Sequence, residues 1–142
     1  MATNARRRLL KDLAKIKESP TEGISAAPDD DNIYEWDAVI YGPNNTSWEG
    51  GIFILKIKFT EDYPNKAPNV VFKSKMFHPN VYDNGNICLD ILDNMWSPVY
   101  DVAAILVSIR SLLCDPNTSS PANVPAARLF NDNKAKYYQK VE

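Results

Sequence analysis

Apolar residues near the start of the chain recur at helical spacing. Leu9, Leu13 and Ile16 are four and three positions apart, and basic residues occupy the opposite side. Ser19-Pro20 ends this pattern, because the residue before a proline avoids the helical conformation. The pattern therefore predicts an N-terminal amphipathic helix.

Alternation with a period of two follows, which is typical of strands. It runs from Ile33 to Tyr41 and from Ile52 to Phe59, and a shorter strand is predicted at 69–73. An acidic turn at 29–32 is expected just before the first strand of the sheet. Because the connections are short, the strands are expected to pair as an antiparallel meander.

The stretch from Ser74 to Tyr100 has no clean period and is punctuated by proline, asparagine and glycine. It holds the one histidine, His78, and one of the two cysteines, Cys88. A long irregular segment inside a compact domain usually carries function. The chemistry is therefore sought here.

A second helix is predicted after Asp101, which can cap it, and shorter helices are predicted from 124 and from 133 onward. Val107 lies almost opposite its apolar stripe, with small residues beside it. This outer side is either a contact surface or an ordinary exposed face. The predicted buried stripe comprises Val102, Ile105, Leu106, Ile109, Leu112 and Leu113.

Size and composition fit one globular domain over residues 1–142. The chain has 142 residues, 44% of them apolar, and a formal charge of −2, which argues against a nucleic-acid-binding protein. Its longest apolar run, 102–107, is far too short to cross a membrane. The basic residues from Arg6 to Lys17 form either a solvated helix face or a docking surface for an acidic partner.

The two cysteines are too few for a disulfide scaffold and indicate a reducing compartment. Cys88 follows a turn amid polar residues, and is either a nucleophile or a small buried hydrophobe. Cys114 follows Leu112 and Leu113, which favours a structural role in the core.

His78 has three possible roles. One histidine and two distant cysteines do not make a structural zinc site, so no metal is expected. It could serve as the base of a Cys-His hydrolase, or it could be structural. Asn80, two positions on, is either a donor toward an oxyanion or a turn residue.

Four motifs in order resemble the ubiquitin-conjugating enzymes, over nearly the whole chain. They are Tyr63-Pro64-Asn65-Lys66-Ala67-Pro68, His78-Pro79-Asn80, Cys88 ten positions after His78, and Trp96-Ser97-Pro98. The wording of 5–9 and 74–82 is similar to the branch that serves post-replication DNA repair and histone monoubiquitination.

The resemblance implies an α+β fold: an N-terminal helix, a four-stranded antiparallel meander, an irregular active-site segment, a central helix and short C-terminal helices, the last truncated at Glu142. It implies that Cys88 accepts ubiquitin as a thioester from the activating enzyme and, with a ligase, transfers it to substrate lysines. No cofactor is expected on this chain, since ATP and Mg²⁺ are used by the activating enzyme.

The resemblance also implies roles at the active site. Asn80 stabilises the oxyanion or orders the nearby loop, and Asp90 and Ser120 orient or deprotonate the acceptor lysine. Ser120 stands where many relatives carry an acid, which makes its phosphorylation a possible control. The residues implied to shape the active-site loop are His78, Pro79 and Tyr82.

The implied partners are ubiquitin, its activating enzyme, a RING-type ligase and protein substrates such as histones or replication clamps, in cytoplasm and nucleus. Val107, Ser108 and Ser111 are implied to contact the donor ubiquitin. The alternatives are a carrier of another modifier, a non-catalytic ubiquitin-binding module and a cysteine hydrolase. The implied ligase and activating-enzyme contacts are Arg7, Arg8, Lys11, Asn65, Trp96, Ser97 and Pro98.

Overall fold

The computed structural model describes residues 4–117 and 121–141. Helix α1 spans Asn4–Glu18, and the strands are β1 (Ile24–Asp29), β2 (Asn32–Tyr41), β3 (Ile52–Lys58) and β4 (Asn69–Phe72). The short 3-10 helix η1 (Asp90–Leu92) precedes α2 (Val102–Cys114), α3 (Val124–Asp132) and α4 (Lys134–Val141). The predicted α+β fold is confirmed.

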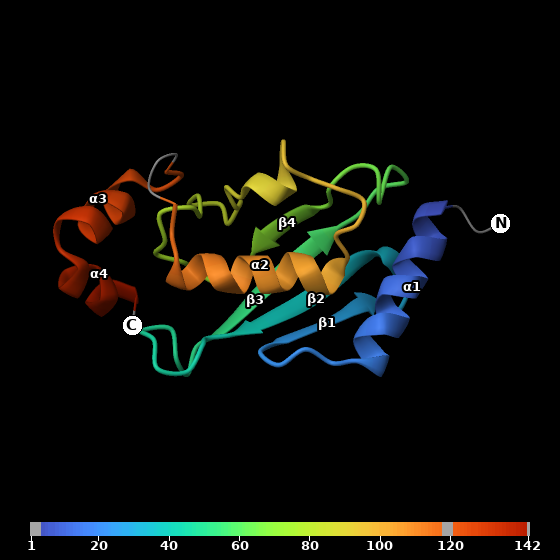
Figure 1. The fold of residues 1–142 in the computed structure, drawn as a ribbon, viewed down its shortest axis with the longest axis horizontal. Helices are drawn as coiled ribbons and strands as arrows, with labels where there is room; N and C mark the ends of the chain where they lie inside the picture. Colours follow the sequence, from blue (N-terminus) through green and yellow to red (C-terminus); the bar gives the residue numbers. More distant parts are fainter. Residues whose placement is uncertain (1–3, 118–120, 142) are drawn as a thin grey trace.

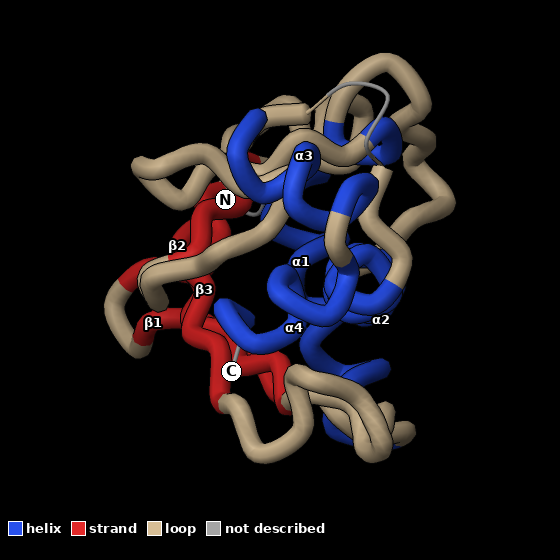
Figure 2. The backbone as a smooth tube through the Cα atoms, turned by 90° about the vertical axis from the view of Figure 1, so that its left-hand side faces the viewer, coloured by secondary structure: helices blue, strands red, loops and turns tan. Residues whose placement is uncertain are grey.

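The strands form one antiparallel meander in the order β1-β2-β3-β4. Figure 1 shows α2 lying across this sheet, with α1 at one end and the α3–α4 pair at the other. Seen from the side, the helices gather on one face of the sheet (Figure 2). The other face presents exposed Tyr41, Ile52 and Ile54.

The core lies between the sheet and α2. Alternating residues of β2 and β3 meet the predicted stripe of α2, and Trp36 pairs in register with Ile57. The predicted cap of α2 is confirmed, because the Asp101 carboxylate accepts from the Ala104 amide at 2.8 Å. The main buried apolar residues are Leu9, Trp36, Ile40, Leu55, Ile57, Ile105, Leu106, Ile109 and Leu113.

Strand β1 was not predicted from the alternation, which placed the first strand at 33–41. Its residues Ala26, Ala27 and Pro28 favour strands weakly, but Pro28 is tolerated because β1 is an edge strand. The acidic turn is therefore the tip of the β1–β2 hairpin and not a connection into the first strand.

Candidate active site

Cys88 follows a narrow hairpin formed by residues 80–88. The Tyr82 amide donates to the Asn86 carbonyl at 2.9 Å, and the Cys88 amide donates to the Asn80 carbonyl at 2.7 Å. The hairpin is attached to β4, because the Phe72 amide donates to the Gly85 carbonyl at 2.9 Å. The sheet thus fixes the backbone that leads to the cysteine.

Gly85 is required at the tip of this hairpin. Its φ of +92° lies in the left-handed region, and a Cβ atom there would lie 2.2 Å from the Phe72 carbonyl oxygen. Only glycine combines that conformation with so close an approach of two backbones.

Cys88 is half-buried and lines a groove of about 690 Å³. Tyr82 and Asn117 also line the groove, as do the exposed carboxylates of Asp90 and Asp93. Asp90 begins η1, where its carboxylate accepts from the Ile91 amide at 2.8 Å. Cys88 is therefore partly accessible to solvent through this groove.

His78 is completely buried, and both ring nitrogens are bonded to backbone. Nδ1 accepts from the Asn80 amide at 3.0 Å, so Nε2 carries the proton and donates to the Leu112 carbonyl at 2.7 Å. Burial lowers the pKa of His78 to about 4, against the opposing effect of its bond to that carbonyl. The ring is therefore neutral and has no lone pair directed at Cys88, so it cannot serve as the base of a hydrolase.

Pro79 and Asn80 hold the chain that follows α2. The Pro79 carbonyl accepts from the Ala122 and Asn123 amides at 2.7 and 3.0 Å. The Asn80 side chain donates to the Asn117 carbonyl at 2.6 Å and accepts from the Asn117 amide at 2.8 Å. His78 thus binds backbone in the last turns of α2, whereas Pro79 and Asn80 bind backbone of the α2–α3 connection. Ser120 lies outside the described residues.

This arrangement can be compared with known proteins. The sequence profile of the family described as "Ubiquitin-conjugating enzyme" matches residues 8–142. The chain belongs to the ubiquitin-conjugating enzyme family. It is similar to "Ubiquitin-conjugating enzyme E2 3" of Arabidopsis thaliana, with 60% identity over 99% of this chain and 94% of the relative. It is also similar to "Ubiquitin-conjugating enzyme E2 1" of Caenorhabditis elegans, with 57% identity over 100% of this chain and 74% of the relative.

As a ubiquitin-conjugating enzyme, the protein is a cysteine-thioester transferase that works with ubiquitin, an activating enzyme and a ligase. Among the described residues, no group of three His, Cys, Asp or Glu side chains could hold a metal ion. Within the same ranges, no helix has the length and apolar character needed to cross a membrane.

The residues expected to contact partners of the conjugating enzyme lie in α1, in the loop at 63–68 and in the segment at 96–100. Arg7, Lys11 and Asn65 are exposed, as is Pro98. Trp96 is half-buried, and its indole donates to the Pro64 carbonyl at 2.8 Å. The structure therefore brings these three segments together at one end of the molecule.

Arg8 differs from its exposed neighbours. Its guanidinium donates to the Pro98 and Tyr100 carbonyls at 2.7 and 2.8 Å, and its Nε donates to Asp12 at 3.0 Å. Asp12 is buried, which the sequence analysis did not anticipate. A carboxylate three positions after Leu9, on the apolar side of a helix, was the available signal.

The outer face of α2 carries Val107 and Ser111, both exposed, and Ser108, which is half-buried. Cys114 is exposed on the same face, so the prediction of a core cysteine was wrong. Seven positions separate it from Val107, and that spacing returns to the same side of a helix.

Proposed function

We propose that Cys88 is the residue that carries ubiquitin. The observation that carries this proposal is its place at the end of a hairpin anchored to β4, beside an open groove. Its thiolate would attack the thioester carbon of ubiquitin on the activating enzyme. A new C–S bond forms, the enzyme's cysteine leaves as a thiolate, and a lysine amine later displaces Cys88 in the same way.

The side chains around Cys88 would divide two tasks. Asn80 would order the loop after α2 or stabilise the oxyanion, and its two bonds to Asn117 support the first of these roles. His78, Pro79 and Tyr82 shape the backbone, which fits a buried and neutral His78. Asp90 and Ser120 would orient or deprotonate the acceptor lysine, and phosphorylation of Ser120 would add negative charge to that residue.

The proposed partner contacts are mostly exposed side chains. The docking surface for ligase and activating enzyme would comprise the exposed Arg7, Lys11, Asn65 and Pro98, with the half-buried Trp96 and Ser97 beside them. The donor ubiquitin would pack on the outer face of α2, at Val107, Ser108 and Ser111, and the exposure of Val107 and Ser111 supports this placement.

For substrates, we place the protein in DNA repair and histone monoubiquitination, in nucleus and cytoplasm. The similarity of residues 5–9 and 74–82 to that branch supports this assignment. The chain itself would bind no cofactor, since ATP and Mg²⁺ act on the activating enzyme.

The test is a charging assay with activating enzyme, ubiquitin and Mg-ATP, followed on gels with and without reductant. We expect an adduct one ubiquitin heavier that reductant removes. Cys88→Ser should give an ester that resists reductant, whereas Cys114→Ser should still form the thioester. Charging of Cys88→Ser through a reductant-sensitive bond would refute the assignment.

The substrate assignment needs its own assay. A panel of ligases, with nucleosomes and replication clamps as acceptors, should yield monoubiquitinated histone or clamp. Discharge by the panel without modification of either acceptor would contradict that assignment while leaving the carrier activity intact.

A further inference from the structure

Arg8 joins α1 to two other segments of the proposed docking surface. Besides its bonds to Asp12, Pro98 and Tyr100, its guanidinium carbon lies 5.6 Å from the centre of the Tyr63 ring. Each of the three guanidinium nitrogens therefore has a partner inside the molecule. Only 22% of the side chain is exposed.

Asp12 extends the same cluster to the loop at 63–68. It is 4% exposed, and its second oxygen accepts from the Tyr63 hydroxyl. Burial, together with this bond to Asp12, raises the pKa of that hydroxyl, so Tyr63 remains a donor. The Trp96 ring lies between Tyr63 and Tyr100, at 6.1 and 5.7 Å from their ring centres. Side chains, rather than strand pairing, thus hold the docking end together.

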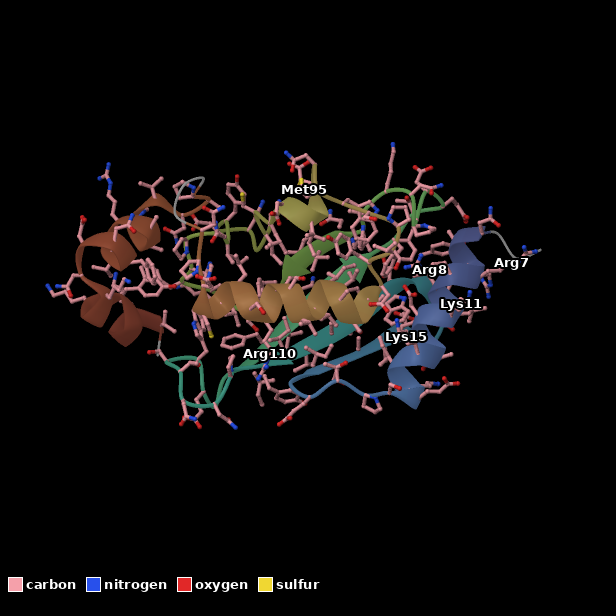
Figure 3. The ribbon with its side chains drawn as sticks, in the orientation of Figure 1. Arg7, Arg8, Lys11, Lys15, Met95 and Arg110 are labelled. Carbon is pink, nitrogen blue, oxygen red and sulfur yellow. The ribbon has the colours of Figure 1, made fainter. Side chains whose placement is uncertain are left out.

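The labelled side chains show the contrast along α1 (Figure 3). Arg7 projects at the outer end of the helix, whereas Arg8 lies on the side toward the loops. Arg7 and Lys11 are exposed and can meet a partner directly. Arg8 is only partly exposed, and its guanidinium already donates to two backbone carbonyls and to Asp12.

We propose that Arg8 is a positioning residue, which fixes the backbone at 98–100 and thereby the docking surface without itself contacting the partner. Two carbonyls, separated by one residue, accept from two nitrogens of one rigid plane. A lysine carries its donors on a single atom and has no equivalent of Nε, so it cannot bind both carbonyls and Asp12 in this geometry. The inference rests on the docking surface proposed above.

The test compares Arg8→Lys with Arg128→Lys, the same change on an exposed residue of α3. ¹⁵N NMR is recorded on the protein without bound ubiquitin. The signals of the Val99, Tyr100 and Asp101 amides and of the Trp96 indole should change in Arg8→Lys and remain unchanged in Arg128→Lys. In thioester formation with the ubiquitin-activating enzyme, the KM for this protein should rise about tenfold, by more than any fall in kcat.

A raised KM with unchanged signals at 96–101 would indicate that Arg8 contacts the partner directly, and would overturn the proposal. An unchanged KM would also overturn it, because the docking surface would then not depend on Arg8. Tyr63→Phe provides a second variant if Arg8→Lys does not fold, because it removes one hydroxyl and keeps the ring. It should shift the same signals by smaller amounts, and an unmoved Trp96 indole would contradict the network. Failure of the unaltered protein to charge would instead refute the proposed function.

Discussion

Irregular backbone lies at both ends of α2, and different kinds of side chain hold it in place at each end. At the active-site end, irregular backbone is held by the neutral side chains of His78 and Asn80. At the docking end it is held by charged groups, chiefly Arg8 with Asp12 and Lys15 with Asp101. In both places, side chains bind backbone that no sheet reaches.

The difference predicts different responses to the solvent. Neutral hydrogen bonds between buried groups change little with salt, whereas ion pairs near the surface are screened by it. Although burial by itself raises the pKa of the Asp101 carboxyl, the hydrogen bonds from Lys15 and the Ala104 amide outweigh it and hold the pKa below its ordinary value. The docking end should therefore respond to ionic strength, and the active-site end to the charge state of His78.

The largest effect is expected from Gly85→Ala at the active-site end. Left-handed strain and the clash with Phe72 together should cost about 3–4 kcal/mol of unfolding free energy, measured by urea denaturation. Gly50→Ala is the matched control, because Gly50 has a φ of +84° with nothing within 4 Å of the added Cβ. It should cost about 1 kcal/mol. Equal losses would mean that the hairpin is not tightly seated on β4.

The second-largest effect is expected from acid, which should lower the free energy of unfolding by protonating His78 at the active-site end. The folded-state pKa of His78, about 4, lies below the ordinary 6.5, so the unfolded chain binds the proton more readily. Stability is therefore complete above 6.5 and is lost as pH falls toward 4, by about 3 kcal/mol in all. Unfolding curves across this range test the slope.

His78→Gln is the control for that titration, since it cannot gain the proton. Its stability should depend less on pH between 6.5 and 4, whatever its absolute value. The contribution of Asp101 has the same sign but falls in a lower window, below its ordinary pKa of 3.8. An identical slope in His78→Gln and the unaltered protein would place the acid response elsewhere.

Asn80→Ala separates the two roles given to that residue. Discharge to lysine should slow by about 10²-fold while thioester formation is nearly retained, because the amide supports the second step. Asn131→Ala, on an exposed part of α3, should match the unaltered protein. Asn80→Asp keeps an acceptor for the Asn117 amide, so partial recovery would favour loop ordering over oxyanion stabilisation. Equal falls in the rates of thioester formation and of discharge would argue against both roles.

The smallest effect is expected at the docking end. Asp101→Ala removes the cap of α2 and should cost about 1 kcal/mol. Asp101→Asn keeps an oxygen for the Ala104 amide, so it should lower the free energy of unfolding by less. Because it lacks the ion pair with Lys15, its stability should vary less with salt than that of the unaltered protein. Thermal denaturation in low and high salt measures both. A salt response retained in Asp101→Asn would remove the ion pair with Lys15 as its source.

Much of the fold could be predicted because its signals are local. The periods of α1, β2, β3 and α2 lie within single segments, and the structure confirms them. Strand β1 was not predicted from the sequence, because its residues have little strand preference and it forms by pairing with β2. Cys114 was misplaced because its apolar neighbours outweighed the helical spacing from Val107, which pointed outward.

The sequence by itself determined the order of elements, the apolar faces that form the core, and the motifs on which the proposed role of Cys88 is based. The tertiary structure decided which polar groups meet: Asn80 with Asn117, 37 positions away, and Arg8 with Pro98, 90 positions away. Periodicity extends over a few residues, whereas a hydrogen bond forms only within about 3 Å. Partners so distant along the chain are therefore selected only when the sheet and α2 have packed.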